Sequence, residues 1–244
     1  MTRWIFFAIC FLSATLISND PQNNLRFIIW NIGQGQWTTL ISENYCDHFD
    51  IGGEFDLSRK VIRICANRKH RVHLSHWDWD HMGLLQKIRQ KGIKPCLWNR
   101  PLGKSSARKE SLLSGLTACS GDNKIPFQKI YSGDKGPKAS TNESSQVVLA
   151  HQILIPGDSP KKEELKWANQ SLLSNTKGLI LGHHGSRSST SLYLLKHLPK
   201  LQWAIATARY KRYKHPHPEV IGRLQKNKTP ILKTEDWGSI EFIL

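Results

Sequence analysis

The chain has 244 residues, 39% of them hydrophobic and 22% charged, a composition that excludes disordered and collagen-like proteins. Its 35 Lys and Arg residues outnumber 19 Asp and Glu residues and give a formal net charge of +16. This excess favours a polyanionic partner, such as nucleic acid, an anionic membrane surface or an anionic wall polymer. A basic composition without any such partner is the alternative.

The N-terminal residues 1–20 differ in character from the rest of the chain. Arg3 precedes an apolar run from Trp4 to Ile17, and polar residues follow that run. The run is shorter than the roughly 20 residues of a membrane-spanning helix and suits the apolar region of a signal peptide. We therefore expect a signal peptide or, because no A-x-A site follows, a short membrane anchor. Either one predicts a periplasmic or secreted protein.

Export would permit disulfides among the cysteines that follow Cys10, which are Cys46, Cys65, Cys96 and Cys119. No C-x-x-C pair is present, which argues against a structural zinc site built from them. A bridge between Cys96 and Cys119 could close the polar stretch between them. The spacing does not fix the pairing, so four free buried thiols are the alternative.

Beyond residue 24 the chain shows no internal repeat and no linker long enough to separate domains. In its first part we expect strands within 25–41 around the Gly33–Gly35 turn, within 45–53 and within 68–75, then a helix within 82–92 and a loop-rich connection over 99–141.

Strands and helices alternate in the second part. We expect a strand pair in 145–158, a helix in 159–173 capped by Ser159, a strand in 178–186, a helix in 191–198, a strand in 203–208, a helix in 218–227 and two strands in 230–244. This order predicts a layered α/β sandwich.

The stretch HLSHWDWDHMGLL concentrates histidine and aspartate. On an extended strand end, His76, Asp78 and Asp80 would share one face, and His81 would follow as the chain turns into a helix. Imidazole and carboxylate ligands in this arrangement suit zinc or, with this many carboxylates, manganese.

Three further expected strand ends carry matching side chains. They are Asp50 in FDIGG, Asp158 in IPGD, and His183 and His184 in LGHHGS. Loops at strand ends form the functional site in layered α/β folds. A carboxylate between two ligand clusters suits a two-metal centre, because each of its oxygens can serve one ion.

The pattern H-x-D-x-D-H resembles the H-x-H-x-D-H motif of the metallo-β-lactamase superfamily, with Asp78 in place of the second histidine. With NIGQGQ, DIGG, NESSQVV, PGD, GHHGSRSSTS and YKHPHPEV in this order, residues 25–244 resemble the hydrolase domain of ComEC-type DNA-uptake competence proteins. The resemblance implies a single αββα four-layer domain over 25–244. The transmembrane channel of those proteins is not expected here, because no long apolar segment follows Ile17.

The resemblance also implies how the ligands divide between two metal ions. His76 and Asp78 would hold the first ion and Asp80 and His81 the second, with Asp158 bridging and His183, or alternatively His184, completing the second site.

Three positions depart from the pattern of these proteins. Asn31 and Gln36 replace the two acids of the glycine turn, and Asn142 stands near the place of a third histidine of the first site. The first site would therefore bind its ion weakly or only together with substrate, and Asn142 becomes a candidate substrate contact.

The implied reaction is phosphodiester hydrolysis by a water activated between two zinc or manganese ions, with no organic cofactor. Asp80 or Asp158 would orient that water, and Ser186 would contact the non-bridging oxygens. His215 and His217 are candidates for phosphate contacts, and His217 for the leaving-group acid. A purely structural role in a loop stiffened by prolines is the alternative for both.

The run ARYKRYKHPHP places Arg209, Lys211 and Arg212 among tyrosines. Cations for phosphates and rings for bases are the pattern of single-stranded nucleic-acid binding. Trp77 and Trp79 could add stacking, although we expect at least one of them to pack in the core.

These features lead to one hypothesis and two alternatives. We expect an exported, metal-dependent nuclease or phosphodiesterase that acts on DNA. A phosphorylcholine-esterase-like enzyme with another phosphodiester substrate, or a catalytically weakened DNA-binding module, would fit the same residues. Metal stoichiometry separates the enzymes from the module.

Overall fold

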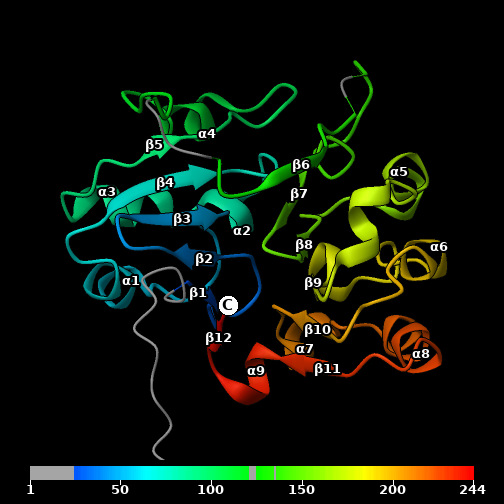
Figure 1. Cartoon of the computed structure of the whole chain (residues 1–244). Coiled ribbons are helices and arrows are strands. Elements are labelled where there is room, and N and C mark those ends of the chain that lie inside the picture. The colour runs from blue at the N-terminus through cyan, green and yellow to red at the C-terminus, as the bar shows by residue number, and fades with distance from the viewer. Residues whose placement is uncertain (1–24, 121–124, 135) are drawn as a thin grey trace, which may run out of the picture.

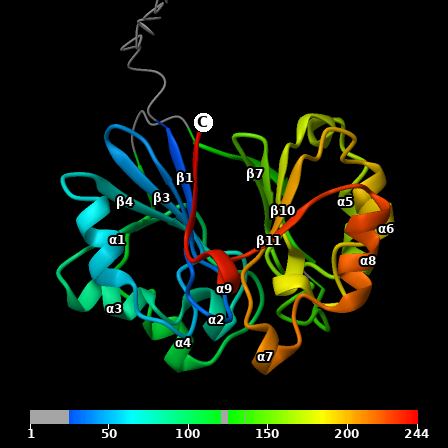
Figure 2. The same cartoon turned by 90° about the horizontal axis from the view of Figure 1, so that it is seen from below.

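The computed structural model describes residues 25–120, 125–134 and 136–244. The expected signal peptide or anchor lies outside these residues. Two sheets face each other, and helices cover the outer face of each (Figure 2). This arrangement is the four-layer αββα sandwich that the sequence predicts. Among the described residues, no helix has both the length and the apolar character needed to cross a bilayer.

The first sheet is antiparallel from β12 to β3 and parallel from β3 to β5 (Figure 1). Its strands, in spatial order, are β12 (Ile240–Ile243), β1 (Arg26–Ile29), β2 (Thr38–Ile41), β3 (Tyr45–Phe49), β4 (Lys69–His73) and β5 (Cys96–Leu97).

The second sheet is parallel from β11 to β8 and antiparallel from β8 to β6. Its strands, in spatial order, are β11 (Ile231–Lys233), β10 (Trp203–Ala206), β9 (Gly178–Ile180), β8 (Ile153–Ile155), β7 (Val147–Ala150) and β6 (Gln128–Tyr131).

The helices are short. Those that follow strands of the first sheet are α1 (Ser58–Ile64), α2 (Trp79–Met82), α3 (Leu85–Gln90) and α4 (Ala107–Ser111). Those that follow strands of the second sheet are α5 (Lys161–Trp167), η2 (Ser171–Asn175), η3 (Gly182–Gly185), α6 (Leu192–Lys196), α7 (Tyr210–Tyr213), α8 (Pro218–Lys226) and α9 (Thr234–Trp237).

Side chains point alternately to the two faces of each strand, and they pack into three core layers. In β1, Phe27 and Ile29 point to the layer between the sheets, whereas Ile28 joins the layer beneath the helices of the first sheet. In β8, Ile153 faces the layer between the sheets and Leu154 faces the helices of the second sheet. The period of two in the sequence thus produces both faces of each sheet.

Some local expectations are wrong. The connection over 99–141 contains α4 and β6, and helices α1 and α7 were not expected. Ser159 does not cap α5, because Pro160 occupies the N-cap position and the Ser159 hydroxyl accepts a hydrogen bond from Trp167 Nε1 at 3.1 Å. Packing of a buried tryptophan thus takes the hydroxyl away from the helix end.

Two disulfides join the four cysteines, Cys46 to Cys65 and Cys96 to Cys119. The first ties β3 to the end of α1, and the second closes the segment that contains α4. The alternative of four free thiols is therefore wrong. Because Cys65 is bridged, its sulfur is not free to bind a metal with the adjacent His48 and His70.

Replacing both Cys96 and Cys119 by serine should lower the free energy of unfolding by about 3 kcal/mol, because the bridge closes a loop of 23 residues in the unfolded chain. Urea denaturation of the oxidised wild type and the double variant measures the difference. An unchanged midpoint and slope would show that this bridge does not constrain the unfolded chain.

Candidate metal centre

The candidate site lies at one edge of the sandwich, where β4, β8 and β9 end. Asp158 follows β8, and His183 and His184 follow β9. These strands come from both sheets, and their carboxyl ends bring the histidines and aspartates together as expected. The ligand atoms of His76, His81 and Asp158 lie within 4.8 Å of one another, as do those of Asp80, His81 and His184.

The first cluster does not lie on an extended strand end. β4 already ends at His73, Asp78 is the N-cap of α2, and Asp80 lies within α2. The expectation of one shared strand face is therefore wrong, although the side chains still converge. The chain turns at Asp78, whose carbonyl accepts from the N–H of His81 at 3.0 Å, and the Asp80 carbonyl accepts from the backbone N–H of Gln36 at 2.9 Å.

Gly52 allows this turn to lie against the neighbouring loop. A Cβ atom at Gly52 would come within 2.2 Å of the backbone carbon of Asp80. No side chain fits in that space, so the glycine after FDI sets how closely α2 approaches the first sheet.

The carboxylate of Asp158 lies at the centre, and its two oxygens face different histidines. Oδ1 is 3.0 Å from His81 Nε2 and 3.6 Å from His184 Nε2. Oδ2 is 3.5 Å from His183 Nε2 and 3.9 Å from His76 Nε2. The carboxylate therefore divides the cluster into two groups of candidate ligands.

Each group contains a further aspartate. Asp78 Oδ2 is 3.4 Å from His76 Nε2, and Asp80 Oδ2 is 3.3 Å from His184 Nε2. The geometry favours His184 for the second site, beside Asp80, and places His183 on the side of the first site. Sequence reasoning named His183 first for the second site and His184 as the alternative.

The backbone explains how adjacent histidines face opposite sides of Asp158. His183 and His184 have φ of 50° and 54°, in the left-handed region that non-glycine residues rarely adopt. Their rings lie 73° apart in orientation, with centroids separated by 6.2 Å. Such strain costs roughly 1–3 kcal/mol at each residue, and it is typical of functional sites.

Outer hydrogen bonds hold all four imidazoles with Nε2 towards the centre. The Nδ1 atoms of His76 and His81 contact Ser75 Oγ at 2.9 Å and Asp50 Oδ2 at 2.8 Å. The Nδ1 atoms of His183 and His184 contact Ser188 Oγ and Thr207 Oγ1, both at 3.3 Å. Metal-binding histidines in proteins have such partners on the second nitrogen.

Asp50 organises this outer layer. Its carboxylate accepts hydrogen bonds from the backbone N–H and the hydroxyl of Ser75, both at 2.7 Å, and from Gln36 Nε2 at 3.1 Å. Sequence reasoning noticed Asp50 only as a strand-end acid and missed Ser75 and Thr207. The position of Ser75 directly before His76 was the available signal. Gln36, which replaces an acid, here supports a carboxylate.

The buried polar atoms at the centre lack ordinary partners. Among the described residues, His76 Nε2 and Asp158 Oδ1 are buried without a hydrogen-bond partner. His81 Nε2 and His184 Nε2 are 3.1 Å apart. Two nitrogens bound to one tetrahedral ion at the usual 2.0–2.1 Å would be separated by about 3.3 Å. The histidine and aspartate donor set is therefore compatible with metal binding.

The ionisable side chains of the cluster shift one another's pKa values. Burial alone would lower the pKa of His81, but the carboxylates of Asp158 and Asp50 raise this pKa well above its usual value. Burial alone would raise the pKa of Asp158, but His81 and His184 hold it well below its usual range. A divalent cation at this position would replace the proton that His81 otherwise carries.

Glu54 partly neutralises the cationic side chains at α7 that the sequence predicts to contact substrate. Arg209 Nη1 and Arg212 Nη1 lie 3.2 and 2.8 Å from the carboxylate of Glu54, and the Tyr213 hydroxyl donates to it at 3.1 Å. Lys211 is exposed on the same helix. Glu54 thus fixes α7 near the Gly33–Gly35 turn, a role that no local sequence pattern indicates.

The remaining predicted substrate contacts lie around His183. His215 packs against its ring, with centroids 6.2 Å apart, and burial lowers the pKa of His215 to about 4. Asn142 Nδ2 is 3.4 Å from His183 Nδ1, and the Ser186 hydroxyl is 3.0 Å from that of Ser188. His217 instead caps α8, its Nδ1 accepting from the backbone N–H of Glu219 at 3.2 Å.

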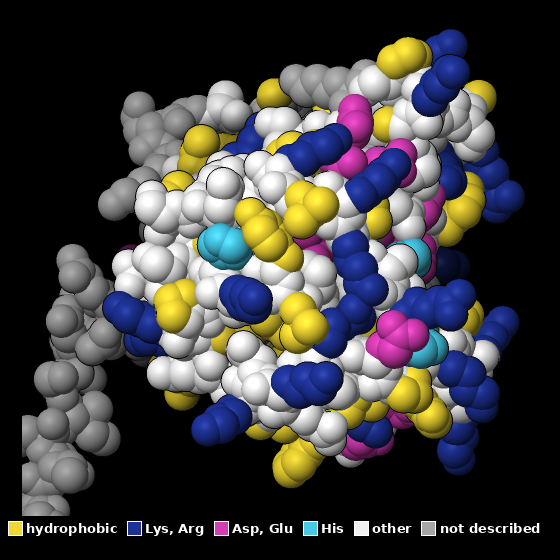
Figure 3. Space-filling model, turned by 90° about the vertical axis from the view of Figure 1, so that its right-hand side faces the viewer, with side chains coloured by type: hydrophobic (Ala, Val, Ile, Leu, Met, Phe, Trp, Pro, Cys, Tyr) yellow, Lys and Arg dark blue, Asp and Glu magenta, His cyan; other side chains and the backbone are white. Residues whose placement is uncertain are grey.

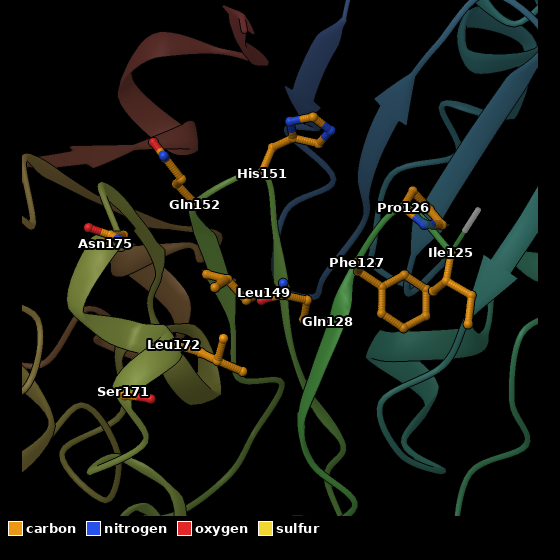
Figure 4. A pocket seen from close by; sticks show the side chains of 10 residues that line it. All are labelled: Ile125, Pro126, Phe127, Gln128, Leu149, His151, Gln152, Ser171, Leu172 and Asn175. Carbon is orange, nitrogen blue, oxygen red and sulfur yellow. The ribbon is translucent and has the colours of Figure 1, made fainter.

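A cavity of about 570 Å³ lies at the other end of the strands. It is lined by the β7–β8 turn, by residues that lead into β6, and by η2 (Figure 4). Asp158 follows the carboxyl end of β8, whereas Gln152 in this cavity precedes its start. The cavity is therefore separate from the metal centre.

The metallo-β-lactamase fold protein YhfI from Bacillus subtilis superposes on the chain with a TM-score of 0.55 at 10% identity, covering 90% of this chain and 99% of YhfI. The chain has the metallo-β-lactamase fold. This confirms the expected fold, and the candidate ligands lie within it.

Sequence comparison finds competence proteins. The chain is 24% identical to competence protein ComA of Neisseria gonorrhoeae over 242 residues, which cover 91% of this chain and 33% of ComA. It is 33% identical to recombination protein 2 of Haemophilus influenzae over 227 residues, which cover 86% of this chain and 28% of that protein. The expected resemblance to competence proteins is confirmed.

The chain spans a third or less of the length of these relatives. No family model matches the sequence.

Replacing Asp50 by asparagine should weaken manganese binding about 10- to 100-fold, because the outer partner of His81 and Ser75 is lost. Isothermal titration calorimetry of the folded variant measures this change. The control is Asp56→Asn, a surface aspartate that contacts Ser58 and Lys91. Equal affinities for the Asp50 variant and wild type would exclude this role.

Proposed function

We propose that the chain is an exported metal-dependent hydrolase that cleaves phosphodiester bonds of DNA. One observation carries the proposal: the two oxygens of Asp158 face separate groups of histidine and aspartate within a metallo-β-lactamase fold. His76, Asp78 and His183 would hold one ion, and Asp80, His81 and His184 the other, with Asp158 shared. Bound zinc or manganese would supply Lewis acidity and a water of lowered pKa.

The protein's own residues prepare the site for this chemistry. In the tautomer that donates Nδ1–H to these outer partners, the Nε2 atoms of His76, His81 and His184 present a lone pair to the centre. Burial of His76, His81 and His184 excludes water from the ligand side. Asp78 and Asp80 are half-buried, so they mark the side from which a phosphodiester would enter.

DNA as substrate is supported by charge and by the relatives. Lys and Arg side chains are scattered over the α5–α6–α8 face, with several acids among them (Figure 3). Together with the formal charge of +16, this attracts a polyanion. The names of the matched proteins refer to competence and recombination. The two disulfides support an oxidising compartment, and hence export.

A catalytically weakened DNA-binding module is the second candidate. Lys109 Nζ lies 3.5 Å from Asp78 Oδ1 and competes with a cation for that carboxylate. If this pair persists, the first ion binds weakly and DNA is held without being cut. A panel that contains DNA, RNA and a phosphorylcholine ester also separates nuclease activity from hydrolysis of another phosphodiester.

His76→Ala and Asp158→Asn should each reduce manganese-dependent DNA degradation at least about 100-fold, because several kcal/mol of charge stabilisation depend on these ligands. Degradation of single- and double-stranded DNA, followed on gels, measures the loss. The matched control is His151→Ala, a histidine in the turn between β7 and β8 that should leave activity unchanged. Wild-type protein that leaves both DNA forms intact with either metal would exclude the nuclease.

A further inference from the structure

Trp77 and Trp79 flank Asp78, and they differ in how far their rings are exposed to solvent. Trp77 is 4% exposed and belongs to the core beneath the first sheet, whereas Trp79 is 41% exposed. Trp79 is the first residue of α2 and lies in the chain between the candidate ligands Asp78 and Asp80. The exposed ring therefore lies beside the candidate ligands and outside the core.

The surroundings of this ring are cationic. The guanidinium carbon of Arg108 lies 5.1 Å from the Trp79 ring centroid, and Lys109 Nζ lies 5.8 Å from it. Both cations belong to α4, which has no buried residue of its own. In the described part of the chain, no ion pair engages Arg108, whereas Lys109 also approaches Asp78. Arg108 is therefore available to a phosphate.

We propose that Trp79 is a stacking platform for an unpaired base next to the phosphodiester bound at the metal centre, and that Arg108 contacts the adjoining phosphate. This deepens the DNA hydrolase proposed above and rests on it. An indole beside cations is the combination that binds single strands, since every base offers a flat face and every nucleotide a phosphate. A base inside a duplex cannot reach the ring, so the preferred substrate is single-stranded DNA or a frayed end.

The proposed platform on α2 differs from the tyrosines around α7 that the sequence suggested for stacking. Tyr213 and two arginines of α7 are engaged by Glu54, and this contact holds them in place. Trp79 has no such restraint from an acid, and Arg108 can leave its ring for a phosphate when a base takes its place. The stacking surface nearest the candidate ligands thus belongs to α2.

The test measures binding with manganese bound and with phosphorothioate linkages in the DNA, which resist hydrolysis, so that cleavage does not interfere. Fluorescence anisotropy gives the Kd of the full chain for labelled oligo-dT, for the matched duplex, and for an oligonucleotide of the same length made of abasic sites. Trp79→Ala should weaken oligo-dT binding about 10-fold, which corresponds to one stacked base, and leave abasic binding unchanged. Trp79→Phe should retain most of the affinity.

Arg108→Ala should weaken oligo-dT and abasic binding to the same extent and reduce the salt dependence by about one phosphate contact. Leu172→Ala, an exposed residue of the separate cavity, is the control and should bind as wild type. Circular dichroism verifies that each variant is folded.

The outcomes separate the two proposals. Equal oligo-dT affinities for wild type and Trp79→Ala, or a Trp79→Ala defect that persists on abasic DNA, would overturn the platform and leave the hydrolase untouched. Trp79-dependent binding without any cleavage of unmodified oligo-dT by the manganese-loaded protein would support the platform and overturn the hydrolase. Wild-type protein that neither binds nor cuts DNA would overturn both.

Discussion

A carboxylate buried among four imidazoles determines how one edge of this sandwich is built. Asp158 is 3% exposed, and its oxygens lie 3.0–3.9 Å from the Nε2 atoms of His76, His81, His183 and His184. Burying a charge is costly unless oppositely charged or hydrogen-bonding groups surround it. The fold meets this requirement with a second layer of polar groups and with two residues in a strained backbone conformation.

Both sheets contribute side chains to the candidate metal centre. The first sheet provides His76, His81 and Asp50, the partner of His81, and the second sheet provides Asp158 and the adjacent His183 and His184. Each sheet is built on apolar strands whose inner faces pack together, so the polar edge rests on a rigid core. Gln36 bonds to Asp50 where an acid would repel it, and it thereby keeps Asp50 available to orient His81.

Much of the fold and the identity of the cluster could be predicted from the sequence, because both depend on local patterns. Apolar, β-branched runs in β1 and β8 indicated the strands, and the strand ends located Asp158 and the histidines. The sequence could not predict that His183 and His184 face opposite sides of Asp158. That arrangement depends on left-handed backbone angles at these two adjacent residues. Glu54 escaped notice because its arginine partners lie more than 150 positions away in the chain.

The difference between Trp77 and Trp79 has the same origin. An extended segment would have placed both rings on one side, but α2 begins at Trp79 and rotates its side chain away from the core. A helix of one turn leaves almost no periodic signal, so its start was not detectable. The exposed ring beside the ligands is thus a product of tertiary packing, chiefly of the close contact between Gly52 and Asp80.

The central claim is that Asp158 bridges two metal sites. Anomalous diffraction from crystals grown with manganese tests it most directly, because it counts and places the ions. Two peaks per chain are expected, one beside each oxygen of Asp158, with His183 near one and His184 near the other. A map with no peak, or with peaks that do not contact Asp158, would contradict it.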